Sequence, residues 1–99
     1  MLNINKTIEE GKALVKLEGR LDTLTAPNLE EEIQGIKEGL TELVFDFGDL
    51  EYISSAGLRV LLAAQKIMNA QGTMKVTGVN ETINEIFEVT GFSDILTIE

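Results

Sequence analysis

The residues with the clearest chemical potential are two adjacent serines, Ser54 and Ser55, followed by the small residues Ala56 and Gly57. They precede a segment of helical propensity, 58–68. A serine that opens a helix can accept a hydrogen bond from a free backbone N–H group, so the simplest interpretation is a helix cap. A phosphate there would also be tolerated, because the helix dipole and the free N–H groups attract an anion. The small residues would let another protein's active site approach the backbone. These residues alone leave cap and phosphorylation switch equally open.

A second candidate is a pair of carboxylates, Asp46 and Asp49. The sequence places them at the end of an apolar segment of strand length, 43–47, and just beyond it. Folds with parallel strands tend to place their sites at the carboxyl ends of those strands, and two acids there could hold Mg²⁺ or accept a phosphoryl group. An Asp at a strand end more commonly caps a turn, and Gly48-Asp49 is typical turn chemistry. A structural role is therefore favoured.

The composition excludes most other chemistry. The 99 residues contain no Cys, no His and no Trp, which removes disulfides, thiol nucleophiles, imidazole bases and nearly all Cys/His metal sites. A Ser-Lys dyad fails because Gly57 and Leu58 stand where the lysine would be needed, and no glycine-rich phosphate-binding loop is present. We expect neither a metal nor another cofactor.

The charge and the apolar runs limit the partners and the location. Seventeen acidic residues against eight basic ones give a net charge of -9, which makes nucleic acid and anionic membrane surfaces unfavourable partners. No signal-peptide pattern is present, and no apolar run approaches the ~20 residues of a membrane span. We therefore expect a cytoplasmic protein.

The hydrophobic pattern predicts the elements that must position these residues. Alternating apolar residues predict two strands, 2–8 and 13–17, joined by a turn at 9–12 and paired as an antiparallel hairpin. Thr25 and Gly39 mark the start and the end of a first helix, whose apolar stripe includes Leu40. The other expected elements are a strand over 43–47 covered on both faces, a loop over 48–53, a largely buried helix from the serines to Gly72, a strand over 74–77, a helix from Asn80 to Gly91, and a terminal half-turn or edge strand over 94–99 that carries Ile95, Leu96 and Ile98 into the core.

This order predicts the fold class. Strands joined through helices imply parallel pairing with right-handed crossovers, whereas the opening hairpin adds an antiparallel strand. No linker, repeat or low-complexity tract interrupts the chain. We therefore expect one domain over residues 1–99, an α/β (mixed α+β) fold in which helices pack against a mixed sheet.

Several segments carry a family resemblance. The stretch 43–58 resembles the signature segment of the STAS domain, typified by bacterial anti-sigma factor antagonists. Residues 19–22 look like the family's G-x-L-D, residues 25–26 fit the helix start after it, and residues 87–92 resemble its late L/F-x-x-(S/T)-G-L/F. The resemblance runs over essentially the whole chain in the same order. It implies a small mixed β-sheet of about four to five strands with helices packed mainly on one side.

The resemblance also implies a function. Anti-sigma factor antagonists of this family bind, when unphosphorylated, an anti-sigma factor that is itself an ATP-using serine kinase, and this binding frees the sigma factor. The kinase phosphorylates a serine at the start of the second helix and the complex dissociates; a PP2C-type phosphatase reverses the change. That serine falls on Ser55, and the protein would be a binder and substrate, not an enzyme. The implied partner-binding residues are Asp22, Ser54, Ser55, Ala56, Gly57, Leu58 and Arg59.

Two positions depart from the family pattern. Ser54 stands where an acidic residue precedes the phospho-acceptor, and Ala56 stands where a hydroxyl follows it. Ser54 is therefore a rival acceptor. The alternative function is a constitutive STAS subunit of a transport or stress-signalling complex, in which both serines serve only the helix. The oligomeric state stays open between a monomer and a weak dimer.

Overall fold

The amino-terminal hairpin forms as the alternation predicts, but its second strand continues beyond the expected end at residue 17 to Leu21. In the computed structural model, which describes residues 1–99, β1 (Leu2–Glu9) pairs antiparallel with β2 (Lys12–Leu21). The two residues between the strands, Glu10 and Gly11, both have positive φ angles, 47° and 82°. Positive φ at both central residues is the geometry of type I′ hairpin turns, whose twist matches that of the strands.

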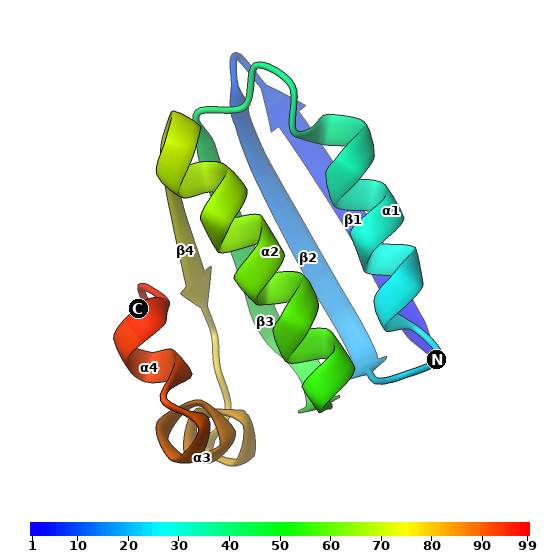
Figure 1. Cartoon of the computed structure of the whole chain (residues 1–99). Helices are drawn as coiled ribbons and strands as arrows, with labels where there is room; N and C mark the ends of the chain where they lie inside the picture. The colour runs from blue at the N-terminus through cyan, green and yellow to red at the C-terminus, as the bar shows by residue number, and fades with distance from the viewer.

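The rest of the sheet is parallel, and the two long helices cover one of its faces. The sheet order is β1-β2-β3-β4, with β2 parallel to β3 and β3 parallel to β4. Figure 1 shows α1 and α2 side by side in front of the sheet, with α4 beside β4 and α3 below the end of that strand. The mixed α/β fold is confirmed. The remaining bounds are α1 Ala26–Ile36, β3 Glu42–Ile53, α2 Ser55–Gln71, β4 Thr73–Thr77, α3 Glu81–Thr90 and α4 Phe92–Ile95.

Strand β3 is longer than expected: the loop prediction over 48–53 was wrong. The pairing with β2 shifts twice, so that β3 holds one extra residue between the partners of Lys16 and Glu18 and another between those of Gly19 and Arg20. Each irregularity interrupts the alternation of buried and exposed residues. Segment 48–53 therefore has the glycine and aspartate that are typical of a turn, but it remains paired with β2 as part of the sheet.

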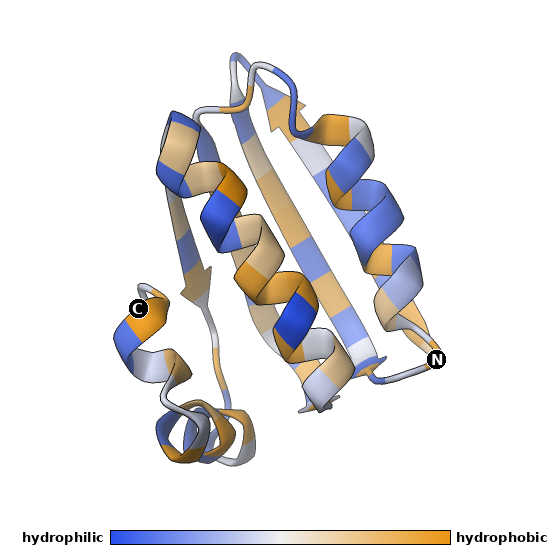
Figure 2. Cartoon of the chain, viewed as in Figure 1, coloured by the Kyte–Doolittle hydropathy of each residue, from blue (hydrophilic) through white to orange (hydrophobic).

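The expectation that β3 is covered on both faces was also wrong. Leu43, Phe45 and Phe47 are buried under the helices, but Val44 and Asp46 point to the other face and are only half-buried. Figure 2 shows the same alternation of hydrophobic and hydrophilic residues along β2. The open face carries ion pairs of Lys12 with Glu42, Lys16 with Asp49 and Lys75 with Glu99.

The end of the first helix and the carboxyl-terminal segment differ from the predictions in detail. Helix α1 ends at Ile36, so Leu40 is buried from the following loop and not from the helix. At the carboxyl end, Leu96 is buried and Ile98 forms a single parallel bridge with Val76, but Ile95 is 46% exposed and does not join the core. None of the helices is long and apolar enough to cross a membrane.

Candidate functional site

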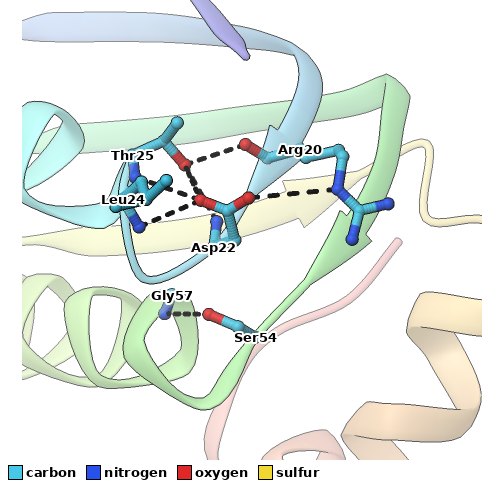
Figure 3. A network of polar contacts seen from close by, with 6 residues as sticks. All are labelled: Arg20, Asp22, Leu24, Thr25, Ser54 and Gly57. Atoms are coloured by element: carbon cyan, nitrogen blue, oxygen red, sulfur yellow. Dashed lines mark hydrogen bonds and ion pairs between the residues drawn. The ribbon is translucent and has the colours of Figure 1, made fainter.

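Strands β2 and β3 end at the same level, which brings the predicted site residues together. Leu21 at the end of β2 lies opposite Ile53 at the end of β3, and the backbone N–H of Ser54 donates to the Leu21 carbonyl oxygen at 2.9 Å. Asp22 and Ser54 each follow one of these paired residues, so they emerge side by side (Figure 3). The extra residues in β3 create this alignment.

The two serines have different surroundings. Ser54 is the N-cap of α2: its backbone is extended, it is half-buried, and its Oγ accepts a hydrogen bond from the backbone N–H of Gly57 at 3.4 Å (Figure 3). Ser55 is the first residue of the helix and is exposed, and its hydroxyl has no protein hydrogen-bond partner. One hydroxyl therefore holds the helix start, and the other is free.

Gly57 is small for a reason other than the predicted approach of a partner. It is buried, and a Cβ there would lie 2.8 Å from both Leu21 Cγ and Ile53 Cγ1. Such a distance is too short for carbon atoms, so only glycine lets α2 lie this close to the strand ends. Leu58 is also buried, with 6% of its surface exposed. Both residues support the site from beneath and do not form its surface.

Asp22 holds a tight turn between β2 and α1. Its Oδ1 accepts hydrogen bonds from the backbone N–H groups of Leu24 at 3.0 Å and Thr25 at 3.1 Å (Figure 3). Desolvation alone would raise the pKa of Asp22, but these backbone hydrogen bonds and one from the Thr25 hydroxyl stabilise the carboxylate and hold the pKa below its usual value. Asp22 is therefore ionised at neutral pH and faces its own backbone.

Sequence reasoning missed the residues around this turn. The Arg20 guanidinium stacks 4.6 Å from the centre of the Tyr52 ring, and its Nε lies 3.9 Å from Asp22 Oδ2. Arg20 is part of the G-x-L-D motif, but its pairing with Tyr52 depends on the irregular register of β3. Leu24 lies in the turn and is 86% exposed.

Arg59 is exposed on the first turns of α2, four residues after Ser55. Residues four apart on a helix lie on the same side, so the Arg59 guanidinium can reach a group attached to Ser55. The ion pairs of the structure all involve other cations. Arg59 and the half-buried Ala56 line a hollow between the starts of α1 and α2, together with Thr23, Ala26, Pro27, Glu30 and Val60.

The two carboxylates of the alternative site lie within β3, not at its end. Asp46 Oδ1 accepts a hydrogen bond from the backbone N–H of Gly48 at 2.8 Å, as the structural interpretation predicts. Asp49 pairs with Lys16 at 3.3 Å, and this hydrogen bond and charge raise the pKa of Lys16. The predicted position at the carboxyl end of the strand was wrong, because β3 continues to Ile53.

Comparisons with known proteins give a consistent result. The family model for the STAS domain matches residues 3–99. BtrV of Bordetella bronchiseptica, whose name makes it a candidate anti-sigma factor antagonist, is 35% identical over 91 residues, which cover 90% of this chain and 78% of BtrV. The anti-sigma-B factor antagonist of Staphylococcus aureus is 29% identical over 99 residues, 98% of this chain and 92% of that protein.

Solved structures share the fold. An anti-sigma factor antagonist from Mycobacterium paratuberculosis superposes with a TM-score of 0.89 at 22% identity, over 99% of this chain and 85% of that one. The phosphorylated form of SpoIIAA, described as a Bacillus cell fate determinant, has a TM-score of 0.76 at 16% identity, over 100% of this chain and 91% of that one. At these identities the structures show a common fold.

Proposed function

The chain belongs to the STAS domain family, and on this premise we propose that it is an anti-sigma factor antagonist that phosphorylation of Ser55 switches off. The match of the family model over residues 3–99 and the names of two relatives of similar length support the class of function. The observation that carries the switch is the free, exposed hydroxyl of Ser55 at the first position of α2.

The different surroundings of the two serines support Ser55 over Ser54 as the acceptor. A kinase must bring the hydroxyl oxygen in line with the γ-phosphate of ATP, so it needs an accessible and movable side chain. Ser55 meets this need. Ser54 is half-buried and its Oγ is engaged with Gly57, so a phosphate on Ser54 would disturb the cap of α2.

The charges near Ser55 support a phosphate there. The first turn of α2 carries no acidic residue, so the helix supplies no negative side chain of its own to the positive end of its dipole. Arg59 is one turn away and has no ion-pair partner. A phosphoserine carries a charge of about -1.5 to -2 and can pair with arginine. The phosphate would be accommodated within the chain, while its bulk and charge would disrupt an interface over Ser55.

The proposal extends to the other components of the switch. The partner is an anti-sigma factor that also acts as the ATP-using serine kinase, and a PP2C-type phosphatase reverses the modification. This chain is their substrate and ligand, not an enzyme, and works in the cytoplasm. Its partner surface includes the exposed residues Ser55 and Arg59 and the partly exposed residues Asp22, Ser54 and Ala56.

The second candidate is a constitutive subunit of a transport or stress-signalling complex. The hydrogen bond from the Gly57 N–H to Ser54 Oγ favours it. In the family pattern an acidic residue precedes the phosphorylated serine, whereas here that position holds Ser54, which caps the helix. In this case Ser55 is never phosphorylated.

The test measures binding and phosphorylation with purified anti-sigma factors of the source bacterium. We expect one of them to bind the wild-type chain and to phosphorylate Ser55 with ATP, as located by mass spectrometry. Ser55→Ala should bind like wild type, and Ser55→Asp should bind at least about tenfold more weakly, a change of about 1.4 kcal/mol. Ser54→Ala is the matched control and should still be phosphorylated. Equal binding by Ser55→Ala and Ser55→Asp, or phosphate only on Ser54, would contradict the proposal.

A further inference from the structure

Leu24 is a large apolar side chain that the fold leaves in water beside the candidate phosphorylation site. It is 86% exposed and lies in the turn between β2 and α1. Single exposed leucines are common on protein surfaces, so exposure alone indicates no function. Two further properties distinguish Leu24: the rigidity of its turn and its position next to the start of α2.

The turn is held by hydrogen bonds on both sides of Leu24. Asp22 Oδ1 accepts from the backbone N–H of Leu24 itself and from that of Thr25 (Figure 3). Thr25 is buried, and its hydroxyl shares its one hydrogen between the Arg20 carbonyl oxygen at 2.8 Å and Asp22 Oδ1 at 3.2 Å. The same hydroxyl oxygen accepts from the Asp22 N–H at 2.9 Å. Because these hydrogen bonds already order the backbone of the turn in the free protein, the turn loses less conformational entropy when a partner covers Leu24.

The position of the turn brings the chain around Leu24 close to the chain around Ser55. The residue before Leu24, Thr23, and the residue after Ser55, Ala56, line the same hollow. The two chain segments are also joined directly, because the Ser54 N–H donates to the Leu21 carbonyl oxygen. A kinase domain that covers Ser55 must therefore lie close to Leu24.

We propose that Leu24 is an anchor residue for the anti-sigma factor, inserted into an apolar pocket beside the kinase active site. This inference rests on the proposed function. Asp22 lies within the partner surface, but its carboxylate is then a positioning group: it is hydrogen-bonded within the turn and acts on the partner through Leu24. An apolar anchor also distinguishes partners, because a kinase with a polar surface at this point would leave Leu24 in water or bury unpaired polar groups against it.

The first experiment measures the Kd of the anti-sigma factor that the wild-type chain binds. Leu24→Ala should raise the Kd by about tenfold or more, as expected when a leucine loses most of its buried apolar area. Leu24→Met, which keeps the volume, should stay close to wild type. The matched control is Ile8→Ala, which also removes three side-chain carbons, from a half-exposed residue near the hairpin turn at the far end of β2 from Leu21. Equal Kd values for Leu24→Ala and Ile8→Ala would overturn the anchor.

A second experiment tests the positioning role of Asp22. Asp22→Asn keeps an oxygen that can accept both backbone hydrogen bonds, whereas Asp22→Ala removes it. If Asp22 acts through Leu24, Asp22→Ala should weaken binding, Asp22→Asn should largely restore it, and the effect of Asp22→Ala should shrink when Leu24 is already alanine. Equal losses for both substitutions, with effects that add to that of Leu24→Ala, would show that the Asp22 charge contacts the partner itself and would overturn this role.

The outcomes separate this inference from the proposed function. If no anti-sigma factor binds the wild-type chain, both fail. If the wild-type chain binds and Ser55→Asp releases the partner, but Leu24→Ala binds as wild type, the function stands and the anchor is wrong. Thermal unfolding of each variant checks the fold, and an exposed Leu24 predicts an unchanged melting temperature for Leu24→Ala.

Discussion

Helices α2 and α3 both begin with a residue whose side chain caps the helix, but the two helix starts differ in detail. At α3, Asn80 has an extended backbone and its Oδ1 accepts from the Ile83 N–H at 2.8 Å. Its Nδ2 donates to the Leu50 carbonyl oxygen at 3.0 Å, and the next residue, Glu81, places a negative charge in the first turn. This helix start is complete: the cap, the link to the sheet and the charge are all supplied by the chain.

Helix α2 has a weaker cap and no negative charge at its start. Ser54 accepts from the Gly57 N–H at the longer distance of 3.4 Å, and the first turn has no acidic residue although the chain has 17 of them. A free hydroxyl, Ser55, occupies the position that Glu81 has at α3. The comparison teaches that α3 supplies the negative charge at its start from its own sequence, whereas α2 leaves that position to an uncharged, exposed hydroxyl, as the proposed phosphorylation of Ser55 requires.

The largest predicted effect concerns the packing under the start of α2. Gly57→Ala should reduce the free energy of unfolding by about 1–3 kcal/mol, because the new methyl group would overlap Leu21 and Ile53. Gly35→Ala in α1 is the control: no atom lies within 4 Å of its Cβ position, so alanine should stabilise the helix by up to about 1 kcal/mol. Chemical denaturation measures both. A Gly57→Ala protein as stable as wild type would show that α2 can shift away from the strands.

The next effect compares the two caps. Asn80→Ala should cost about 1–2 kcal/mol, since it removes a short cap bond and leaves the Leu50 carbonyl oxygen without this donor. Ser54→Ala should cost less, about 0.5–1 kcal/mol, because its cap bond is long. The same denaturation experiment gives the order, and a larger loss for Ser54→Ala would reverse the comparison.

The smallest effect tests the charge at each helix start. Ser55→Asp should raise the free energy of unfolding by about 0.3–1 kcal/mol at low ionic strength, and Glu81→Gln should lower it by a similar amount. Both changes should shrink in high salt, because the dipole interaction is screened. Melting curves at two salt concentrations measure them. Destabilisation by Ser55→Asp at low salt would mean that the start of α2 does not favour an anion.

Much of the fold could be predicted because its signals are local. Alternation predicts the hairpin of β1 and β2, and Gly11 suits a turn residue with positive φ. Glu10 gives no such signal, because a positive φ is uncommon for a residue with a side chain. Asn80 and Gly91 mark the ends of α3 through their own chemistry, a cap and a left-handed residue. The end of β3 could not be predicted in this way, because its extra residues obscure the alternation and only the partner strand β2 keeps it extended.

The candidate site could likewise be predicted only in part. The sequence by itself determined which groups are available: two serine hydroxyls before a helix, an aspartate after a strand, and neither cysteine nor histidine. Only the tertiary structure decided which serine caps and which is free, that Gly57 is buried, and that the turn with the exposed Leu24 lies next to the start of α2. The physical reason is that these outcomes depend on the alignment of Leu21 with Ile53, a register set by contacts between strands far apart in the chain.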